Sequence, residues 1–243
     1  MITAAIIARD EERNIVPCLQ TLAWADERLV LDGGSVDRTV ALCRAMPGVH
    51  VAEREFDNFA CQRNAAMGLA ENDWILFVDA DERVTPELAA EARAVVASPQ
   101  RDGYMVPRFN CILGKVMRHT GWYPDYQLRL LDRRHGRYVE SVPVHEIAEL
   151  DCGEPGHLRE HLLHYNYQTL TQFFRKQERY TDFEARQLLR AGKVRWRSLL
   201  SMPAREFVRR YWTLQGYRDG GHGLLLSALM AYFTFRRYWK CLS

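Results

Sequence analysis

Short apolar runs alternate with helical patterns through the first 85 residues, and this alternation constrains the fold more than any other feature. Strands are predicted at residues 4–8, 28–31, 49–52 and 74–78, and helices at residues 14–23, 35–46 and 58–70, the second of them capped by Ser35. Consecutive parallel strands need such crossover connections, whereas antiparallel strands can be joined by a tight turn. The pattern therefore predicts an α/β fold with a mostly parallel sheet and flanking helices.

The rest of the chain divides into a second sheet-forming segment and a helical tail. Further elements are predicted as a helix at residues 86–96, strands at 103–109 and 126–131, and helices from Thr169 onward. Residues 173–243 contain 15 Lys and Arg but 5 Asp and Glu, against 18 and 26 in the rest of the chain. We therefore expect a first domain over residues 1–168, with parts at 1–85 and 100–168, and a basic, aromatic-rich helical extension over 169–243.

Composition and cysteine usage exclude several classes of protein. Hydrophobic residues at 47% and charged residues at 26% are typical of a globular protein, not of a disordered chain or a polytopic membrane protein. The six cysteines form no CxxC pair, and the N-terminus lacks the basic start and long apolar run of a secretion signal. The longest uncharged stretch, residues 220–235, is short for a membrane span. We expect a cytoplasmic protein with reduced thiols.

Acidic residues follow the predicted strands where each strand ends. These are Asp10, Asp32, Asp79 and Asp81, and the carboxyl ends of parallel strands share one edge of the sheet, where ligands bind. Asp79-Ala80-Asp81 follows the most apolar strand, and paired carboxylates suit Mg²⁺ or Mn²⁺, which in turn bind a diphosphate. An isolated DxD sequence is more often a solvated loop, but the other strand-end acids favour a metal site here.

Two further segments precede helices at the same edge. The glycines of Asp32-Gly33-Gly34-Ser35 allow a tight strand-to-helix turn, and Asp32 is placed to accept a hydrogen bond from a nucleotide base. The competing interpretation is a plain turn with a helix cap. Arg9-Asp10-Glu11-Glu12 would add carboxylates beside the same pocket, although acidic residues are also common at helix N-termini.

Taken together, these motifs resemble the nucleotide-diphospho-sugar-binding half of family 2 glycosyltransferases over residues 2–85. The resemblance implies a GT-A catalytic domain over 1–168 and a donor site whose residues are Ala8, Asp10, Glu11, Asp32, Arg63, Asn64, Asp79 and Ala80. Glu11 and Asp32 would contact the uridine of a UDP-sugar, Asp79 its ribose or the metal, and Asp81 the metal. Two residues depart from the family pattern: Asp10 stands where Asn is usual, and Gly33 where many members have a second Asp.

Motifs further along the chain resemble the subgroup that extends the lipopolysaccharide inner core with glucose. They are Trp122-Tyr123-Pro124-Asp125, Gln127-Leu128-Arg129-Leu130 and Val144-His145-Glu146. Inverting transfer needs a base for the acceptor hydroxyl, and Glu146 is the first candidate and Asp125 the second. His145 is a further candidate metal ligand, although a lone His is more often structural. Acceptor contacts are expected from Trp122, Arg129, Arg133 and Arg134, with Arg137 in the same basic cluster, and a solvated charged face is the alternative.

The helical extension mixes cations with aromatic residues, as a helix lying on an anionic membrane does, although aromatic residues at helical spacing also pack in cores. The cations are Arg205, Arg209, Arg210, Arg236, Arg237 and Lys240. We expect a peripheral enzyme at the inner membrane that transfers a hexose to a lipid-linked glycan and binds no nucleic acid. One alternative is a sugar-phosphate nucleotidylyltransferase, but residues 6–12 lack the glycine-rich, lysine-bearing signature of that class. The other is a nucleic-acid-binding protein, but the strand-end acids would repel its ligand.

Overall fold

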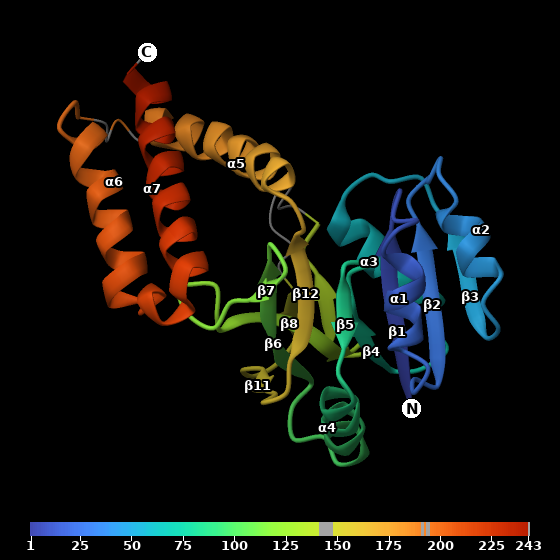
Figure 1. The fold of residues 1–243 in the computed structure, drawn as a ribbon. Helices are drawn as coiled ribbons and strands as arrows, with labels where there is room; N and C mark the ends of the chain where they lie inside the picture. The colour runs from blue at the N-terminus through green and yellow to red at the C-terminus, as the bar shows by residue number, and fades with distance from the viewer. Residues whose placement is uncertain (141–147, 191, 193–194, 243) are drawn as a thin grey trace. The chain divides into compact units, whose positions relative to one another are not determined.

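The computed structural model describes residues 1–140, 148–190, 192 and 195–242, which form two compact units (Figure 1). The sheet unit contains residues 1–108 and 126–164, and the helical unit contains residues 109–125 and 165–243. The units divide after residues 108, 125 and 164, and the predicted domain boundary after residue 168 stays a prediction. The sequence placed residues 109–125 in the first domain, whereas the structure groups them with the helices, because Ile112 and Met117 pack in one core with Phe173 and Leu226.

The sheet is parallel on one side and mixed on the other, which confirms the predicted α/β fold. Its strands are β1 (Ile2–Ala8), β2 (Glu27–Asp32), β3 (Val49–Glu53), β4 (Trp74–Phe77), β5 (Glu82–Val84), β6 (Gly103–Ile112), β8 (Asp125–Asp132) and β12 (Leu162–Tyr167). Their order is β3-β2-β1-β4-β8-β6-β12-β5, and β7 (Lys115–Val116) and β11 (Gly156–His157) pair with β6. A separate antiparallel pair joins β9 (Gly136–Tyr138) to β10 (Ala148–Leu150).

Both faces of β1, of β4 and of the second half of β2 are buried, which explains why these segments read as unbroken apolar runs. Alternate residues of β1 belong to opposite cores: Ile6 packs in one core and Ala5 in the other. The first core includes residues of α1 (Ile15–Gln20), α2 (Thr39–Arg44) and α4 (Pro86–Ala97), and the second includes residues of α3 (Phe59–Leu69).

Local capping interactions fix where several helices begin. The side chain of Asn58 accepts from Cys61 N at 2.9 Å and caps α3, and Thr85 caps α4 directly before a proline that suits the first turn. Before α5 (Leu170–Arg190), Gln172 N donates to the Thr169 hydroxyl while Thr169 N donates to the Gln172 side chain. This reciprocal pair is a capping box.

The helical unit consists mainly of α5, α6 (Ser198–Val208) and α7 (Gly220–Leu242), with a π-helical turn at Arg209–Thr213 and a 3₁₀ helix at Gly216–Asp219. The buried carboxylate of Asp219 ties the segment before β8 to the start of α7. It accepts from His119 N at 3.0 Å and from the Thr120 hydroxyl at 3.0 Å, and it pairs with His119 Nδ1. Across the described ranges, no helix combines the length and the apolar character needed to cross a membrane.

Candidate functional site

The carboxyl ends of β1, β2 and β4 lie at one edge of the sheet unit. Ala8 is in register with Asp32, and Ala5 with Phe77, so the residues that follow these three strands are neighbours. Ala8 is buried and its carbonyl accepts from Gly33 N at 2.8 Å, which holds the glycine turn against the end of β1. The strand-end acids of the sequence are therefore brought to one edge, which we call the donor edge.

The loop after β1 is hydrogen-bonded to the loop after β2. Backbone N–H groups of Asp10, Glu11 and Glu12 donate to Ser35 Oγ (2.9 Å), Thr39 Oγ1 (2.8 Å) and Asp37 Oδ2 (3.0 Å), and Val36 N donates to Asp10 Oδ1 (2.8 Å). Asp10 has a φ of 56°, in the left-handed region that Asn and Asp tolerate better than most residues. Aspartate in place of the family's asparagine therefore preserves the backbone at this position.

The side chain of Asp32 is directed into its own loop. It is buried and accepts from Gly34 N at 2.9 Å, Ser35 N at 2.8 Å and Ser35 Oγ at 2.5 Å. The prediction that Ser35 caps the following helix was wrong, because this hydroxyl is bonded to Asp32 and α2 begins only at Thr39. Glu11 accepts from Asn14 Nδ2 at 2.7 Å. Contact of Asp32 and Glu11 with uridine stays a prediction.

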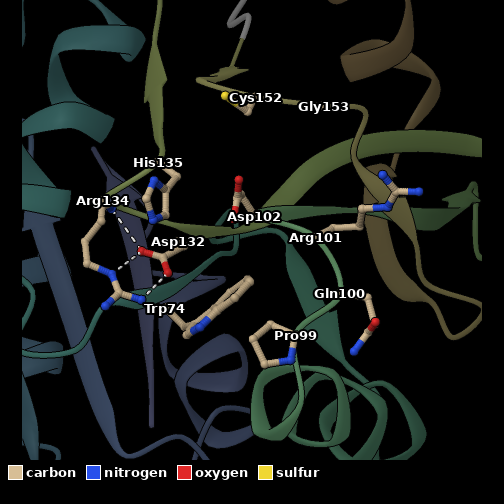
Figure 2. Close-up of a pocket in the computed structure, with 10 residues that line it drawn as sticks. All are labelled: Trp74, Pro99, Gln100, Arg101, Asp102, Asp132, Arg134, His135, Cys152 and Gly153. Atoms are coloured by element: carbon tan, nitrogen blue, oxygen red, sulfur yellow. Dashed lines mark hydrogen bonds and ion pairs between the residues drawn. The ribbon is translucent and has the colours of Figure 1, made fainter.

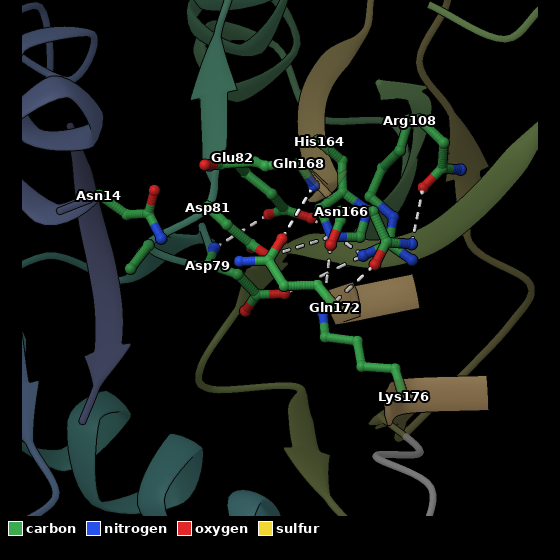
Figure 3. A network of polar contacts seen from close by, with 12 residues as sticks. Asn14, Asp79, Asp81, Glu82, Arg108, His164, Asn166, Gln168, Gln172 and Lys176 are labelled. Carbon is green, nitrogen blue, oxygen red and sulfur yellow. Dashed lines mark hydrogen bonds and ion pairs between the residues drawn. The ribbon is translucent and has the colours of Figure 1, made fainter. Parts of the chain in front are cut away.

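The first carboxylate of the DxD motif is held by arginines, of which Figure 3 labels Arg108. Arg63 Nη2 lies 2.8 Å from Asp79 Oδ1, and Arg129 pairs with both oxygens of the same carboxylate. Arg108 Nη1 lies 3.9 Å from Asp79 Oδ2 and only 2.9 Å from Oε1 of buried Glu82. Burial acts to raise the pKa of Asp79, but the charges of Arg129 and Arg63 hold the pKa well below its ordinary value.

Helix α3 supplies two of the predicted donor residues. The guanidinium of Arg63 is buried between the rings of Phe77 and Tyr138, at 5.0 and 5.4 Å, and its direction toward Asp79 is fixed by this packing. Asn64 pairs with the backbone of Tyr138 in both directions, at 2.9 Å each. In this structure Asn64 therefore anchors β9, and its contact with a nucleotide sugar stays a prediction.

The second carboxylate of the motif has a different partner. Asp81 Oδ2 lies 3.4 Å from His164 Nε2, and 24% of the Asp81 side chain is exposed. His164 reaches this point because β12 pairs antiparallel with β5, in register with Glu82. Buried Ala80, between the two carboxylates, accepts from Arg83 Nη1 through its carbonyl at 2.9 Å. The structure thus divides the motif into one carboxylate bound to arginines and one beside a histidine.

The donor edge offers few side chains that would suit a divalent cation. Within the described part of the chain no group of three His, Cys, Asp or Glu residues is arranged to hold a metal. Mg²⁺ sites at nucleotides commonly use one or two protein ligands together with phosphate oxygens and water. The carboxylate of Asp81 and the imidazole of His164, whose Oδ2 and Nε2 atoms are 3.4 Å apart, are side chains whose chemistry fits this role. Sequence reasoning missed His164, and predicted His145 lies outside the described residues.

The family model described as "Glycosyl transferase family 2" matches residues 3–142, more than half of the chain. The chain belongs to this family. Family membership favours the glycosyltransferase interpretation over the two alternatives raised by the sequence.

Curated relatives match almost the whole chain. It is 27% identical to the lipopolysaccharide core biosynthesis glycosyltransferase LpsC of Rhizobium meliloti (strain 1021), over 96% of this chain and 89% of the relative. It is also 26% identical to the uncharacterized glycosyltransferase RC0292 of Rickettsia conorii, over 98% of this chain and 89% of the relative.

Solved structures match a smaller part. The chain is 23% identical to S. aureus TarS 1–349 in complex with UDP-GlcNAc, covering 49% of this chain and 37% of that one with a TM-score of 0.42. It is 21% identical to the mannosyltransferase PcManGT from Pyrobaculum calidifontis in complex with GDP-Man and Mn²⁺, covering 44% and 35% with a TM-score of 0.40. The chain thus spans less than half the length of these two structures.

The arginines expected to border one acceptor pocket of this glycosyltransferase lie in different places. Strand β8 runs antiparallel to β4, with Leu130 opposite Leu76 and Asp132 opposite Trp74. Arg129 therefore lies at the donor edge, whereas the residues after β8 lie beyond the start of β4, at the opposite edge. There Arg133 donates to the carbonyls of Met67 and Ala70, Arg134 pairs with Asp132 and Asp73, and Arg137 pairs with Asp151. The single basic pocket predicted from the sequence does not fit this placement.

A cavity of about 380 Å³ lies at this opposite edge (Figure 2). Its lining includes Trp74, Asp102, Asp132, Arg134 and His135, and the carboxylate of Asp132 is held by Arg134. The cavity contains none of the strand-end acids of the donor edge.

The remaining predicted residues of the glycosyltransferase lie in the helical unit or outside the described residues. Asn110 Nδ2 lies 2.9 Å from the Trp122 carbonyl and 3.3 Å from Asp125 Oδ2. The Trp122 ring packs on Tyr167, with ring centroids 6.1 Å apart. Glu146, the first candidate for the base, lies outside the described residues together with His145.

Proposed function

We propose that this glycosyltransferase transfers a hexose, glucose by resemblance, with inversion from a UDP-sugar to a lipid-linked glycan such as the lipopolysaccharide inner core. The observation that carries the proposal is the donor edge itself, where two linked loops lie beside the half-buried carboxylate of Asp81 and its partner His164. The LpsC relative supports the acceptor class, because its match extends over 96% of this chain and includes the helical unit.

Each part of the donor edge has a role in this proposal. Asp81 and His164 would hold Mg²⁺ or Mn²⁺, which supplies charge compensation for the leaving diphosphate. The three arginines at positions 63, 108 and 129 face two carboxylates, Asp79 and Glu82, which fixes the position of both, and the charges of Arg129 and Arg63 hold the pKa of Asp79 low. Asp79 then acts by positioning the motif, and Asp81 acts on the metal.

The test of the donor site is calorimetric titration of UDP in the presence of Mn²⁺. Asp81→Ala should abolish metal-dependent binding, whereas Asp102→Ala removes a carboxylate at the opposite edge and should bind like the wild type. A thermal shift with UDP and Mn²⁺, but none with duplex DNA, is expected from the same protein. Unchanged UDP affinity in Asp81→Ala would end the metal assignment.

The acceptor base is proposed to be Glu146, with Asp125 as the second candidate. Glu146→Gln retains the size of the side chain but cannot accept the proton, so turnover should fall by about 100-fold or more while donor binding is unchanged. Asp125→Asn should have a smaller effect if Asp125 orients the acceptor. An active Glu146→Gln enzyme beside an inactive Asp125→Asn enzyme would assign the base to Asp125.

Transfer to an acceptor of this class would take place at the cytoplasmic face of the inner membrane, with an anionic membrane surface as a partner. A lipid-linked glycan is presented at a bilayer, and the basic, aromatic-rich composition of the helical extension suits anionic lipid.

A further inference from the structure

The helical unit exposes a continuous apolar ridge along α6. Its residues follow one another at intervals of four, from the turn before the helix to the π-helical turn after it: Trp196, Leu200, Ala204, Val208 and Trp212. The exposed fractions are 72% for Trp196, 74% for Leu200 and 60% for Trp212. Side chains four residues apart form one ridge of a helix. Exposed tryptophans at both ends of such a ridge are unusual in a surface that faces only water.

A row of cations runs beside the ridge. Arg197, Arg205 and Arg209 are exposed and each lies one position after a ridge residue. The segment 195–218 contains six arginines and a single acidic residue, Glu206. Within the described ranges, Glu206 pairs with Arg209 and Arg210, and no ion pair involves Arg197 or Arg205. This surface therefore has a large excess of positive charge directly beside exposed indole rings.

The cations of α7 form ion pairs within the helical unit, which favours α6 over α7 as the surface that contacts lipid. Arg236 and Lys240 pair with Glu178 at 2.6 Å each, and Arg237 pairs with Glu184 at 2.6 Å. These contacts join α7 to α5 within the helical unit, so the C-terminal cations that the sequence offered for lipid binding are largely neutralised by the protein itself. Helix α6 packs beside α7 (Figure 1). The ridge residues Trp196, Leu200 and Trp212 are nevertheless exposed.

We propose that the α6 face, defined as the ridge of Trp196, Leu200, Ala204, Val208 and Trp212 with Arg197, Arg205 and Arg209, docks on an anionic phospholipid bilayer. Indole rings are favoured at the depth of lipid headgroups, and the adjacent guanidinium groups attract anionic headgroups. The inference deepens the membrane partner of the proposed function by assigning the contact to α6 instead of α7. It rests on that function for the acceptor, but the binding surface can be tested without it.

The test is flotation of the full chain with vesicles of phosphatidylcholine alone and of phosphatidylcholine with phosphatidylglycerol. Arg197→Glu/Arg205→Glu should reduce the partition coefficient for anionic vesicles by at least about tenfold, since each cation at such a surface contributes several-fold to binding. Trp196→Ser/Trp212→Ser should reduce it comparably. The control Arg101→Glu/Arg159→Glu makes the same change of charge at exposed positions of the sheet unit and should float like the wild type.

Three readouts keep the result decisive. Circular dichroism and the melting temperature establish that each variant is folded, and UDP binding with Mn²⁺ should be unchanged in all of them. Loss of flotation with normal UDP binding supports the inference, and normal flotation with no UDP binding in the wild type would refute the donor site alone. The inference is overturned if the α6 variants float like the wild type, or if the control pair reduces flotation as much as the α6 pairs do. It is also overturned if the α6 variants only convert a dimer to a monomer in sedimentation experiments, because the face would then bind a second copy.

Discussion

The unequal roles of the two DxD carboxylates give a prediction that separates stability from donor binding. Asp79→Asn removes a charge that faces Arg63 and Arg129, both buried, and leaves Glu82 as the remaining carboxylate beside Arg129. Breaking a buried ion pair by removing one partner typically costs about 3–5 kcal/mol. A third of the Asp79 side chain is exposed and asparagine retains one acceptor, so we expect the lower end, about 3 kcal/mol.

The same substitution at position 81 should behave in the opposite way. Within the described residues Asp81 is ion-paired with His164, and Asp81→Asn should change the free energy of unfolding by less than about 1 kcal/mol. Its affinity for UDP with Mn²⁺ should fall by at least about 100-fold, because loss of an outer partner of a metal ligand already costs about 10–100-fold.

Thermal unfolding and calorimetric titration of the two variants measure both effects. A loss of about 3 kcal/mol corresponds to a lower melting temperature by roughly 6–12 °C in a chain of this length. Because the folded pKa of Asp79 is lowered, its contribution to stability is complete above its unfolded pKa and is lost as pH falls below that value. The difference between wild type and Asp79→Asn should therefore shrink in acid below about pH 4. A stable Asp79→Asn protein that has lost UDP binding would refute the reasoning.

Three further predictions concern the rest of the chain. Burial raises the pKa of Tyr167 to about 12. The free energy of unfolding of the helical unit should therefore fall by up to roughly 3 kcal/mol as pH rises from about 10 to about 12, measured by alkaline unfolding with phenolate absorbance. Early ionisation of this tyrosine in the folded protein would contradict the prediction. Cys152 is exposed, whereas burial raises the pKa of the Cys18 thiol far above its ordinary value. A thiol reagent should therefore label Cys152 first and Cys18 only on unfolding, as measured by peptide mapping. Gly223→Ala would drive a Cβ into the Gly216 carbonyl oxygen and should destabilise the protein by about 3 kcal/mol or more. Gly221→Ala, with open space around it, should be neutral or stabilising in urea denaturation.

The sequence was sufficient to predict the parallel strands because their signal is local. An unbroken apolar run such as residues 74–78, ended by polar residues, implies burial on both faces whatever its neighbours are. Strands β5 and β12 gave no such signal, since β5 has only three residues and its pairing joins segments about 80 residues apart. His164 was missed for this reason.

The electrostatics of the donor edge depend on contacts that no local pattern reveals. Arg63, Arg108 and Arg129 come from a helix and two different strands, and they converge on Asp79 and Glu82 only after the sheet has formed. The grouping of Arg129 with the arginines after β8 was wrong because closeness in sequence was taken for closeness in space. An antiparallel strand carries the chain from one edge of the sheet to the other within its own length.

The hydrogen bonds between the two donor loops make tolerance to substitution asymmetric. At residues 11 and 12 the loop contributes backbone N–H groups, which every residue except proline possesses, whereas Ser35, Asp37 and Thr39 contribute side-chain oxygens. A library of random variants selected for folding should therefore retain most residues at positions 11 and 12 and exclude proline there. At positions 35, 37 and 39 it should retain only side chains that carry an acceptor oxygen. The loop after β1 can therefore change its side chains at positions 11 and 12, whereas the loop after β2 must keep the side chains that bind the backbone of the first loop.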